Sequence, residues 1–180
     1  MIQFTATLHR PKKAAGTKSV HWTFLKLPKK SSEKLPSRAM VSVEGTFNDH
    51  PFQTTLQPDG AGGHWLRVER KLRIDSGAAL GESVMVKIMP MTEEPEPKVP
   101  TDLRKALTAA PSAKSAWSDI TPLARRDWIQ WITSGKRAET RAIRIDKAID
   151  MLTNGKRRPC CFDRTGMYDK SLSCPEAEEE

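Results

Sequence analysis

Apolar and polar residues alternate through much of the first half of the chain. In residues 2–8 every second side chain is apolar, which is the period of a half-buried β-strand. The same alternation returns in several short segments, separated by clusters of Pro, Gly, Asn and Asp. The pattern therefore predicts strands over residues 2–8, 19–27, 39–47, 52–57, 63–69 and 81–89.

Short strands that follow one another without helical segments favour a small β-barrel or sandwich over residues 1–90. Closing a barrel hides the strand edges that would otherwise pair with other chains. The connection at residues 28–37 is polar and is expected to be exposed and irregular. A glycine-rich run at residues 57–63 lacks the Lys-Ser/Thr ending of a phosphate-binding loop, so we interpret it as a plain connection.

The period of the apolar residues changes to that of an amphipathic helix in the second half of the chain. Thr121-Pro122 is typical of a helix start, because Thr caps the first turn and Pro needs no hydrogen-bond partner there. Gly135 is the matching stop. We predict a helix between them, with a buried apolar side that carries Ala124, Trp128, Trp131 and Ile132.

Two further helices are predicted around this one. One covers residues 138–153, and a shorter one covers residues 102–110 and is ended by Pro111. Residues 112–120 are interpreted as a connection that docks onto the helices through Trp117 and Ile120. Because the two longer helices hold only about thirty residues, they need the rest of the chain or another subunit to bury their apolar sides.

The predicted elements divide the chain into four parts. Residues 1–90 form the barrel, residues 91–100 a linker rich in Pro and Glu, and residues 101–155 a helical segment that packs on the barrel. Residues 156–180 show no period and end in an acidic run, so we expect a disordered tail. The predicted fold class is therefore α+β, with a small N-terminal β-barrel and a C-terminal helical segment.

Positive charge is concentrated in the predicted helices. The chain has a formal net charge of +8, and residues 121–158 contribute ten cations against four anions. Such clustering suits phosphate groups, although a charge run on a helix is also common on a purely solvated face. No recognition helix, RNA-binding motif or zinc finger accompanies it. The candidate polyanion-binding residues are Arg125, Arg126, Lys136, Arg137, Arg144, Lys147, Lys156, Arg157 and Arg158.

Arg141 is considered separately, because its position lies on the apolar side of the helix predicted over residues 138–153. A guanidinium that points towards a core needs a carboxylate, carbonyl groups or a bound anion beside it. Two interpretations follow for this side chain. It forms an ion pair with Asp119 or Asp127, or it binds a small anion.

No catalytic motif accompanies these elements. The four His residues lack the spacing of a helical metal pair, and none has a Cys nucleophile nearby. Cys160, Cys161 and Cys174 fit neither a disulfide framework nor a zinc knuckle. No apolar run is long enough to cross a bilayer, and the first residues are unlike a signal peptide. We expect a cytoplasmic protein with no enzymatic activity and no cofactor.

A longer motif spans the predicted helices. It reads F/W-x-x-[IL]-[ST]-P-x-x-R-R-x-[WY]-[IV]-x-W-I from Trp117 to Ile132, then K-R-x-E-T-R-x-x-R-I-x-K-A from Lys136 to Ala148. This motif resembles the C-terminal signature of the YdeI/OmpD-associated family, also described as bacteriocin-protection proteins, with departures at Leu123 and Gly135. The barrel segments F-x-A-x-L, V-x-W-x-F-L-x-L-P, V-x-V-x-G-T-F and L-G-E-x-V-x-V-x-I resemble the domain of unknown function that accompanies this family.

The resemblance implies a double-split β-barrel, an architecture shared with DNA-binding and antitoxin proteins of the AbrB/MazE type. It implies no assigned reaction. The leading hypothesis is a non-enzymatic bacterial binding or stress-protection protein with a protein or small-molecule partner. The alternatives are a nucleic-acid-binding regulator that uses the basic helices, and a small-anion binder that uses Arg141. The sequence does not predict an oligomeric state.

Overall fold

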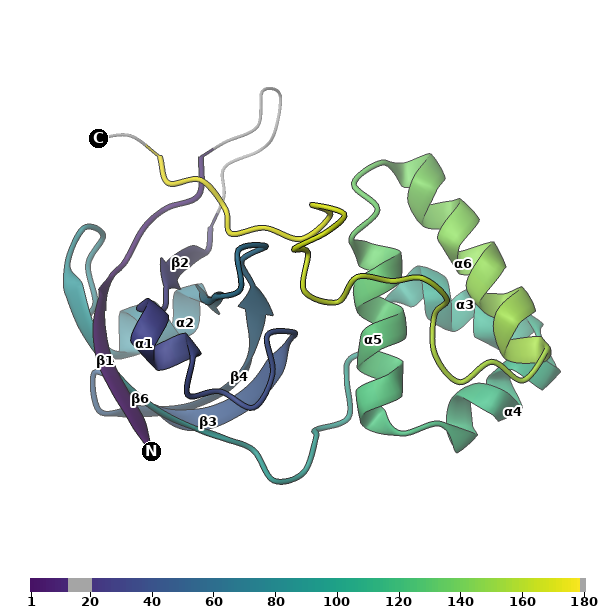
Figure 1. Cartoon of the computed structure of the whole chain (residues 1–180), viewed down its shortest axis with the longest axis horizontal. Coiled ribbons are helices and arrows are strands. Elements are labelled where there is room, and N and C mark those ends of the chain that lie inside the picture. The colour runs from purple at the N-terminus through teal and green to yellow at the C-terminus, as the bar shows by residue number, and fades with distance from the viewer. Residues whose placement is uncertain (13–20, 179–180) are drawn as a thin grey trace. The chain divides into compact units, whose positions relative to one another are not determined.

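The computed structural model describes residues 1–12 and 21–178 and divides them into a barrel unit and a helical unit (Figure 1). The barrel unit comprises residues 1–92 together with the C-terminal residues from Thr165 onwards, and the helical unit comprises Glu93–Arg164. Residues 19 and 20 of the second predicted strand, and most of the loop before it, lie outside the described residues.

Six antiparallel strands form the barrel, as the alternation predicts. They are hydrogen-bonded in the order β1-β6-β3-β4-β5-β2. A bridge between His9 and Phe24 joins the two ends of this order through backbone hydrogen bonds of 2.8 and 2.9 Å, so the barrel is nearly closed. The strands are β1 (Ile2–Thr7), β2 (Thr23–Lys26), β3 (Val41–Phe47), β4 (His50–Pro58), β5 (His64–Val68) and β6 (Ser83–Pro90).

The tightest turn of the barrel joins β3 to β4. Phe47 pairs with His50, which leaves Asn48 and Asp49 as a two-residue loop with φ angles of 45° and 63°. Asn and Asp are the residues that tolerate this left-handed conformation best after Gly, and such turns match the twist of a hairpin. The side chain of Asn48 also accepts a hydrogen bond of 2.9 Å from the backbone N–H of Met85, which ties the turn to β6.

Alternate residues of each strand point into the barrel, because successive side chains of a strand face opposite sides. On β2 and directly after it, Leu25 and Leu27 lie in the core, whereas Phe24 and the preceding Trp22 pack with Trp65. The inward side chains from the other strands include Ile2, Phe4, Val41, Val43, Phe47, Leu56, Leu66, Val68, Val84, Val86 and Ile88.

Two short helices in the barrel unit were not predicted. These are α1 (Lys29–Ser32) and α2 (Arg70–Asp75). The expectation of an exposed, irregular connection at residues 28–37 is wrong in part, because Ser31, Ser32 and Leu35 are buried. A helix of one turn is too short to show the 3.6-residue period by which a helix is recognised in a sequence.

The helical unit contains four helices: α3 (Thr101–Ala109), α4 (Pro111–Asp119), α5 (Pro122–Thr133) and α6 (Ala138–Thr153). Thr121 caps α5 as predicted, since its side chain accepts a hydrogen bond from the N–H of Ala124. The expected connection at residues 112–120 is instead the helix α4. Pro111, which the sequence indicated as the end of the preceding helix, occupies the first turn of α4, where a missing N–H has no cost.

The helical unit has a hydrophobic core of its own. Trp128 and Ile132 of α5 are fully buried, and Leu152 of α6 is 1% exposed. Helices α3 and α4 supply Leu103, Leu107, Ala113 and Trp117 to the same cluster. The two longer helices therefore bury their apolar sides in a core that they share with α3 and α4. None of the helices in residues 1–12 and 21–178 combines the length and the apolar character that crossing a bilayer requires.

The C-terminal residues run along the barrel unit. The N–H of Lys12 donates to the carbonyl of Glu176, and the N–H of Glu178 donates to the carbonyl of Arg10, both at 2.8 Å. Farther back, the carbonyl oxygen of Leu172 lies so close to Gly60 that a Cβ atom there would be only 2.5 Å away. These contacts differ from the disordered tail that the sequence predicts over residues 156–180.

Candidate functional site

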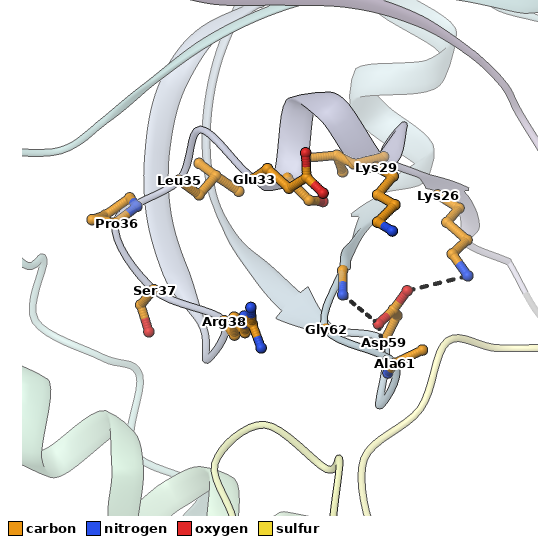
Figure 2. Close-up of a pocket in the computed structure, with 13 residues that line it drawn as sticks. Lys26, Lys29, Glu33, Leu35, Pro36, Ser37, Arg38, Asp59, Ala61 and Gly62 are labelled. Atoms are coloured by element: carbon orange, nitrogen blue, oxygen red, sulfur yellow. Dashed lines mark hydrogen bonds and ion pairs between the residues drawn. The ribbon is translucent and has the colours of Figure 1, made fainter.

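A pocket of about 690 Å³ opens on the barrel unit (Figure 2). Its walls come from the end of β2, from α1 and the segment after it, and from the glycine-rich loop between β4 and β5. Its volume lies within the range of about 300–1,000 Å³ that is common for small-molecule sites. The charged residues that line it are Lys26, Lys29, Glu33, Arg38 and Asp59.

Asp59 shapes the glycine-rich side of the pocket. Its carboxylate is 2% exposed, lies 3.1 Å from the ammonium of Lys26, and accepts hydrogen bonds of 2.8 Å from the N–H groups of Ala61 and Gly63. Burial acts to raise the pKa of Asp59, but the two backbone hydrogen bonds and Lys26 outweigh it, so this pKa lies below its ordinary value. Asp59 is therefore ionised, and it occupies the loop N–H groups that a phosphate-binding loop would offer to a ligand.

Two other cations that line the pocket have no such partner among the described residues. Lys29 and Arg38 are exposed, and neither forms an ion pair with a described residue. Glu33 lines the same opening and is also exposed. Figure 2 shows Lys29, Glu33 and Arg38 around the same space as the Asp59–Lys26 pair. The pocket thus offers a ligand two cations that form no ion pair with a described residue, and one carboxylate.

His64 lies behind the pocket and holds its walls together. The side chain is fully buried, its Nε2 is 2.9 Å from the carbonyl oxygen of Ala39, and its backbone N–H donates to the hydroxyl of Ser32. Burial lowers the pKa of His64, against the opposing effects of the Ala39 carbonyl and the charge of Asp59. The imidazole is therefore neutral at neutral pH, and it links β5 to the segment that carries Arg38.

The candidate arginines of the helical unit, apart from Arg137, are engaged in local contacts. Arg125 donates to the carbonyl groups of Trp117 and Ser118, both at 2.9 Å. Arg144 donates to the carbonyl of Trp131, and its guanidinium lies 5.6 Å from the centre of that Trp ring. The ion pairs of these arginines are Arg125–Glu96, Arg126–Glu94, Arg157–Asp119 and Arg158–Asp127.

Four of the candidate cations remain exposed without an ion pair to a described residue: Lys136, Arg137, Lys147 and Lys156. Lys136 and Arg137 precede α6, and Lys156 follows it. A helix of 16 residues, the length of α6, is about 24 Å long. The structure therefore spreads these cations along the helix and does not bring them together in one cluster.

Arg141 forms an ion pair with Asp102, not with Asp119 or Asp127 as the sequence suggested. The guanidinium makes two hydrogen bonds to the carboxylate, of 2.6 and 3.1 Å, which is the bidentate geometry that arginine favours. The hydrogen bond from Arg141 is the main cause that lowers the pKa of Asp102. Because this carboxylate occupies the guanidinium, Arg141 joins α6 to the first turn of α3.

A nearly closed antiparallel barrel followed by a four-helix unit places the chain in the α+β class. Residues 96–155 match the family described as "Bacteriocin-protection, YdeI or OmpD-Associated", and residues 4–88 match "Domain of unknown function (DUF1905)". The helical unit is therefore a YdeI/OmpD-associated segment, and the barrel is a DUF1905 domain, as the motifs indicated. A search of curated proteins finds no match.

The family segment contains part of the network of arginine contacts in the helical unit. It begins at Glu96, the partner of Arg125, and it contains both members of the Asp102–Arg141 pair. The pocket residues Lys29 and Arg38 lie instead in the DUF1905 domain. Sequence reasoning missed them, because two isolated cations in a polar connection carry no motif.

Proposed function

We propose that this protein is a non-enzymatic binding protein of the YdeI/OmpD-associated type, with a bacteriocin- or stress-protection role in the bacterial cytoplasm. Its binding site is the barrel pocket, and its ligand is a small polar molecule with an anionic group. The observation that carries this proposal is the presence of two cations, Lys29 and Arg38, that line the pocket without an ion pair to a described residue.

The charges of the pocket support a ligand of this kind. A carboxylate or phosphate between Lys29 and Arg38 would form charge-assisted hydrogen bonds, which are about twice as strong as neutral ones. Glu33, on the same opening, suits an ammonium or hydroxyl group of the same ligand. The Asp59–Lys26 pair and the loop around it provide a fixed wall, which reduces the cost of ordering the site on binding.

The thiol beside this pocket supports binding over nucleophilic catalysis. Burial raises the pKa of Cys174 to about 11, with a contribution from the charge of Asp59 and against that of Lys26. A thiol with such a pKa is protonated at neutral pH, whereas the thiolate is the nucleophilic form. Lys26 and Asp59, whose charges act on the pKa of this thiol, are also paired with each other, at 3.1 Å.

Removing the two free cations of the pocket is the direct test. We expect K29A/R38A to weaken binding of citrate or glutamate by at least about tenfold, because a hydrogen bond to a charged group contributes about 1.5–3 kcal/mol. Isothermal titration calorimetry on the full chain measures this affinity. The matched control is K30A/K34A, which removes two exposed cations of the same segment that do not line the pocket. Equal losses in the two variants, or no binding of any of these anions by the parent protein, would contradict the proposal.

A second candidate function, nucleic-acid binding, rests on four exposed cations of the helical unit that the sequence indicated as candidates and that form no ion pair with a described residue. If only Lys136, Arg137, Lys147 and Lys156 contact phosphates, the affinity for duplex DNA should fall by about 150-fold between 50 and 200 mM salt. Contacts from six or more cations would give a fall of more than about a thousandfold and would require the ion pairs of the arginines to open. Fluorescence anisotropy with a labelled duplex measures the slope, and an absence of binding at 50 mM salt excludes this function.

A further inference from the structure

A second and smaller pocket, of about 260 Å³, lies elsewhere on the barrel unit. Three of its lining residues are arginines: Arg10 follows β1, and Arg70 and Arg73 lie three residues apart on α2, so that they share a face of that helix. No acidic residue of the described chain lines it. The other lining residues are His21, Trp22, Thr23 and Leu80.

The arginines of this pocket are only lightly engaged. Arg70 forms no ion pair with a described residue. Arg73 makes a long hydrogen bond, of 3.4 Å, to the carbonyl of Ala78. The nearby carboxylate of Glu69 is bound by Arg67 at 2.9 Å, and the carboxylate of Asp75 by Lys71. Guanidinium groups therefore face this pocket with their hydrogen-bonding capacity largely unused.

Trp22 gives the pocket a fixed wall. Its ring stacks on Trp65 with the ring centres 6.1 Å apart, and the guanidinium of Arg67 lies 4.6 Å from the centre of the Trp22 ring. Phe24 packs edge-on against both tryptophans. These contacts hold the indole in place, so an anion in the pocket would meet a preorganised set of groups.

The C-terminal acidic run contacts Arg10, one of the three arginines of this pocket. Residues 176–178 lie antiparallel to residues 10–12, and this pairing brings the carboxylate of Glu178 to 3.6 Å from the guanidinium of Arg10. Both side chains are substantially exposed, at 46% and 39%, so this ion pair is weak and can be displaced. The chain's own carboxylate thus pairs with one of the arginines that an anionic ligand in the pocket would contact.

We propose that the Arg10–Arg70–Arg73 pocket binds the phosphate group of a phosphorylated ligand, and that Glu178 competes with this phosphate for Arg10. A phosphate is favoured because it accepts several charge-assisted hydrogen bonds at once, and arginine matches its geometry. The phosphate belongs either to a small phosphorylated molecule or to the end of a nucleic-acid strand. This site is separate from the Lys29–Arg38 pocket and does not depend on the function proposed for it.

The test uses pyrophosphate as the probe and the full chain in calorimetric titration. We expect R70A/R73A to weaken pyrophosphate binding by at least about tenfold. K71A, on the same helix, removes a cation that does not line the pocket and should change the affinity by less than about twofold. K29A/R38A should leave pyrophosphate binding at this site intact. Unchanged affinity in R70A/R73A, or no binding by the parent protein, overturns the proposed site.

Two further arms test the competition and the source of the phosphate. E178Q keeps the backbone pairing but removes the competing charge, so it should tighten pyrophosphate binding several-fold. An unchanged affinity in E178Q overturns the competition. A 5′-phosphorylated oligonucleotide that binds more tightly than its unphosphorylated form, with the difference lost in R70A/R73A, assigns the phosphate to a strand end. Equal binding of the two oligonucleotides, with tight pyrophosphate binding, assigns it to a small molecule.

Discussion

Replacing Gly45 by alanine is expected to destabilise the barrel by more than about 3 kcal/mol, a large part of the 5–15 kcal/mol that holds a typical domain folded. Gly45 lies in β3 between its partners Phe52 on β4 and Ile88 on β6. A Cβ atom on Gly45 would lie 1.9 Å from the carbonyl oxygen of Lys87 and 2.9 Å from the Cα of Ile88. Both are backbone atoms of β6, so the two strands would have to separate.

Gly77 provides the matched control for Gly45. Its φ angle of +66° disfavours alanine, but a Cβ atom added there would meet nothing within 4 Å. We expect G77A to cost about 1–2 kcal/mol from backbone strain alone, without the clash. Urea unfolding followed by circular dichroism gives both free energies of unfolding. A free energy of unfolding of G45A equal to or higher than that of G77A would contradict the close approach of β3 and β6 at Gly45.

Replacing Trp128 by alanine is expected to cost the helical unit about 3–5 kcal/mol. Trp128 is fully buried, packs edge-on against Trp131 with ring centres 5.9 Å apart, and donates its indole N–H to the carbonyl of Arg157 at 3.2 Å. Its removal leaves a large cavity and an unpaired carbonyl. Because the barrel has a separate hydrophobic core, the loss should be confined to the helical unit.

Native-state hydrogen exchange resolves the two units in this experiment. In W128A the amides of α5 and α6 should lose protection, while those of β3 and β6 keep it. The control is I143A, since Ile143 is 54% exposed on α6 and its loss should change stability by less than about 0.5 kcal/mol. An equal loss of protection in both units would show that they unfold together, and unchanged protection in α5 would contradict the central place of Trp128 in the core.

The elements with long, regular patterns were predictable from the sequence. Alternation located all six strands, and the Thr121-Pro122 start gave α5 its first residue. Elements without such a pattern were missed. The single-turn helix α1 is too short to show a period, and Pro111 was interpreted only as the end of one helix although it also begins α4.

The partners of charged residues could not be predicted in the same way. The sequence placed Arg141 beside a carboxylate or an anion, because a half-buried guanidinium requires one. Only the packing of α6 against α3 decided that the carboxylate is Asp102, 39 residues away in the sequence. The same holds for Arg125, which was a candidate for binding phosphates and instead donates to the carbonyl groups of α4.

The sequence by itself determined the α+β class, the strands and main helices, and the family of the helical unit, because periodic burial and helix caps depend on residues that are neighbours in the chain. The tertiary structure alone decided which charges are neutralised and which face solvent. Lys29 and Arg38 line one pocket, and Arg10, Arg70 and Arg73 line another, because barrel closure brings distant segments together. A charge interacts through space, so its role depends on contacts that local sequence patterns do not encode.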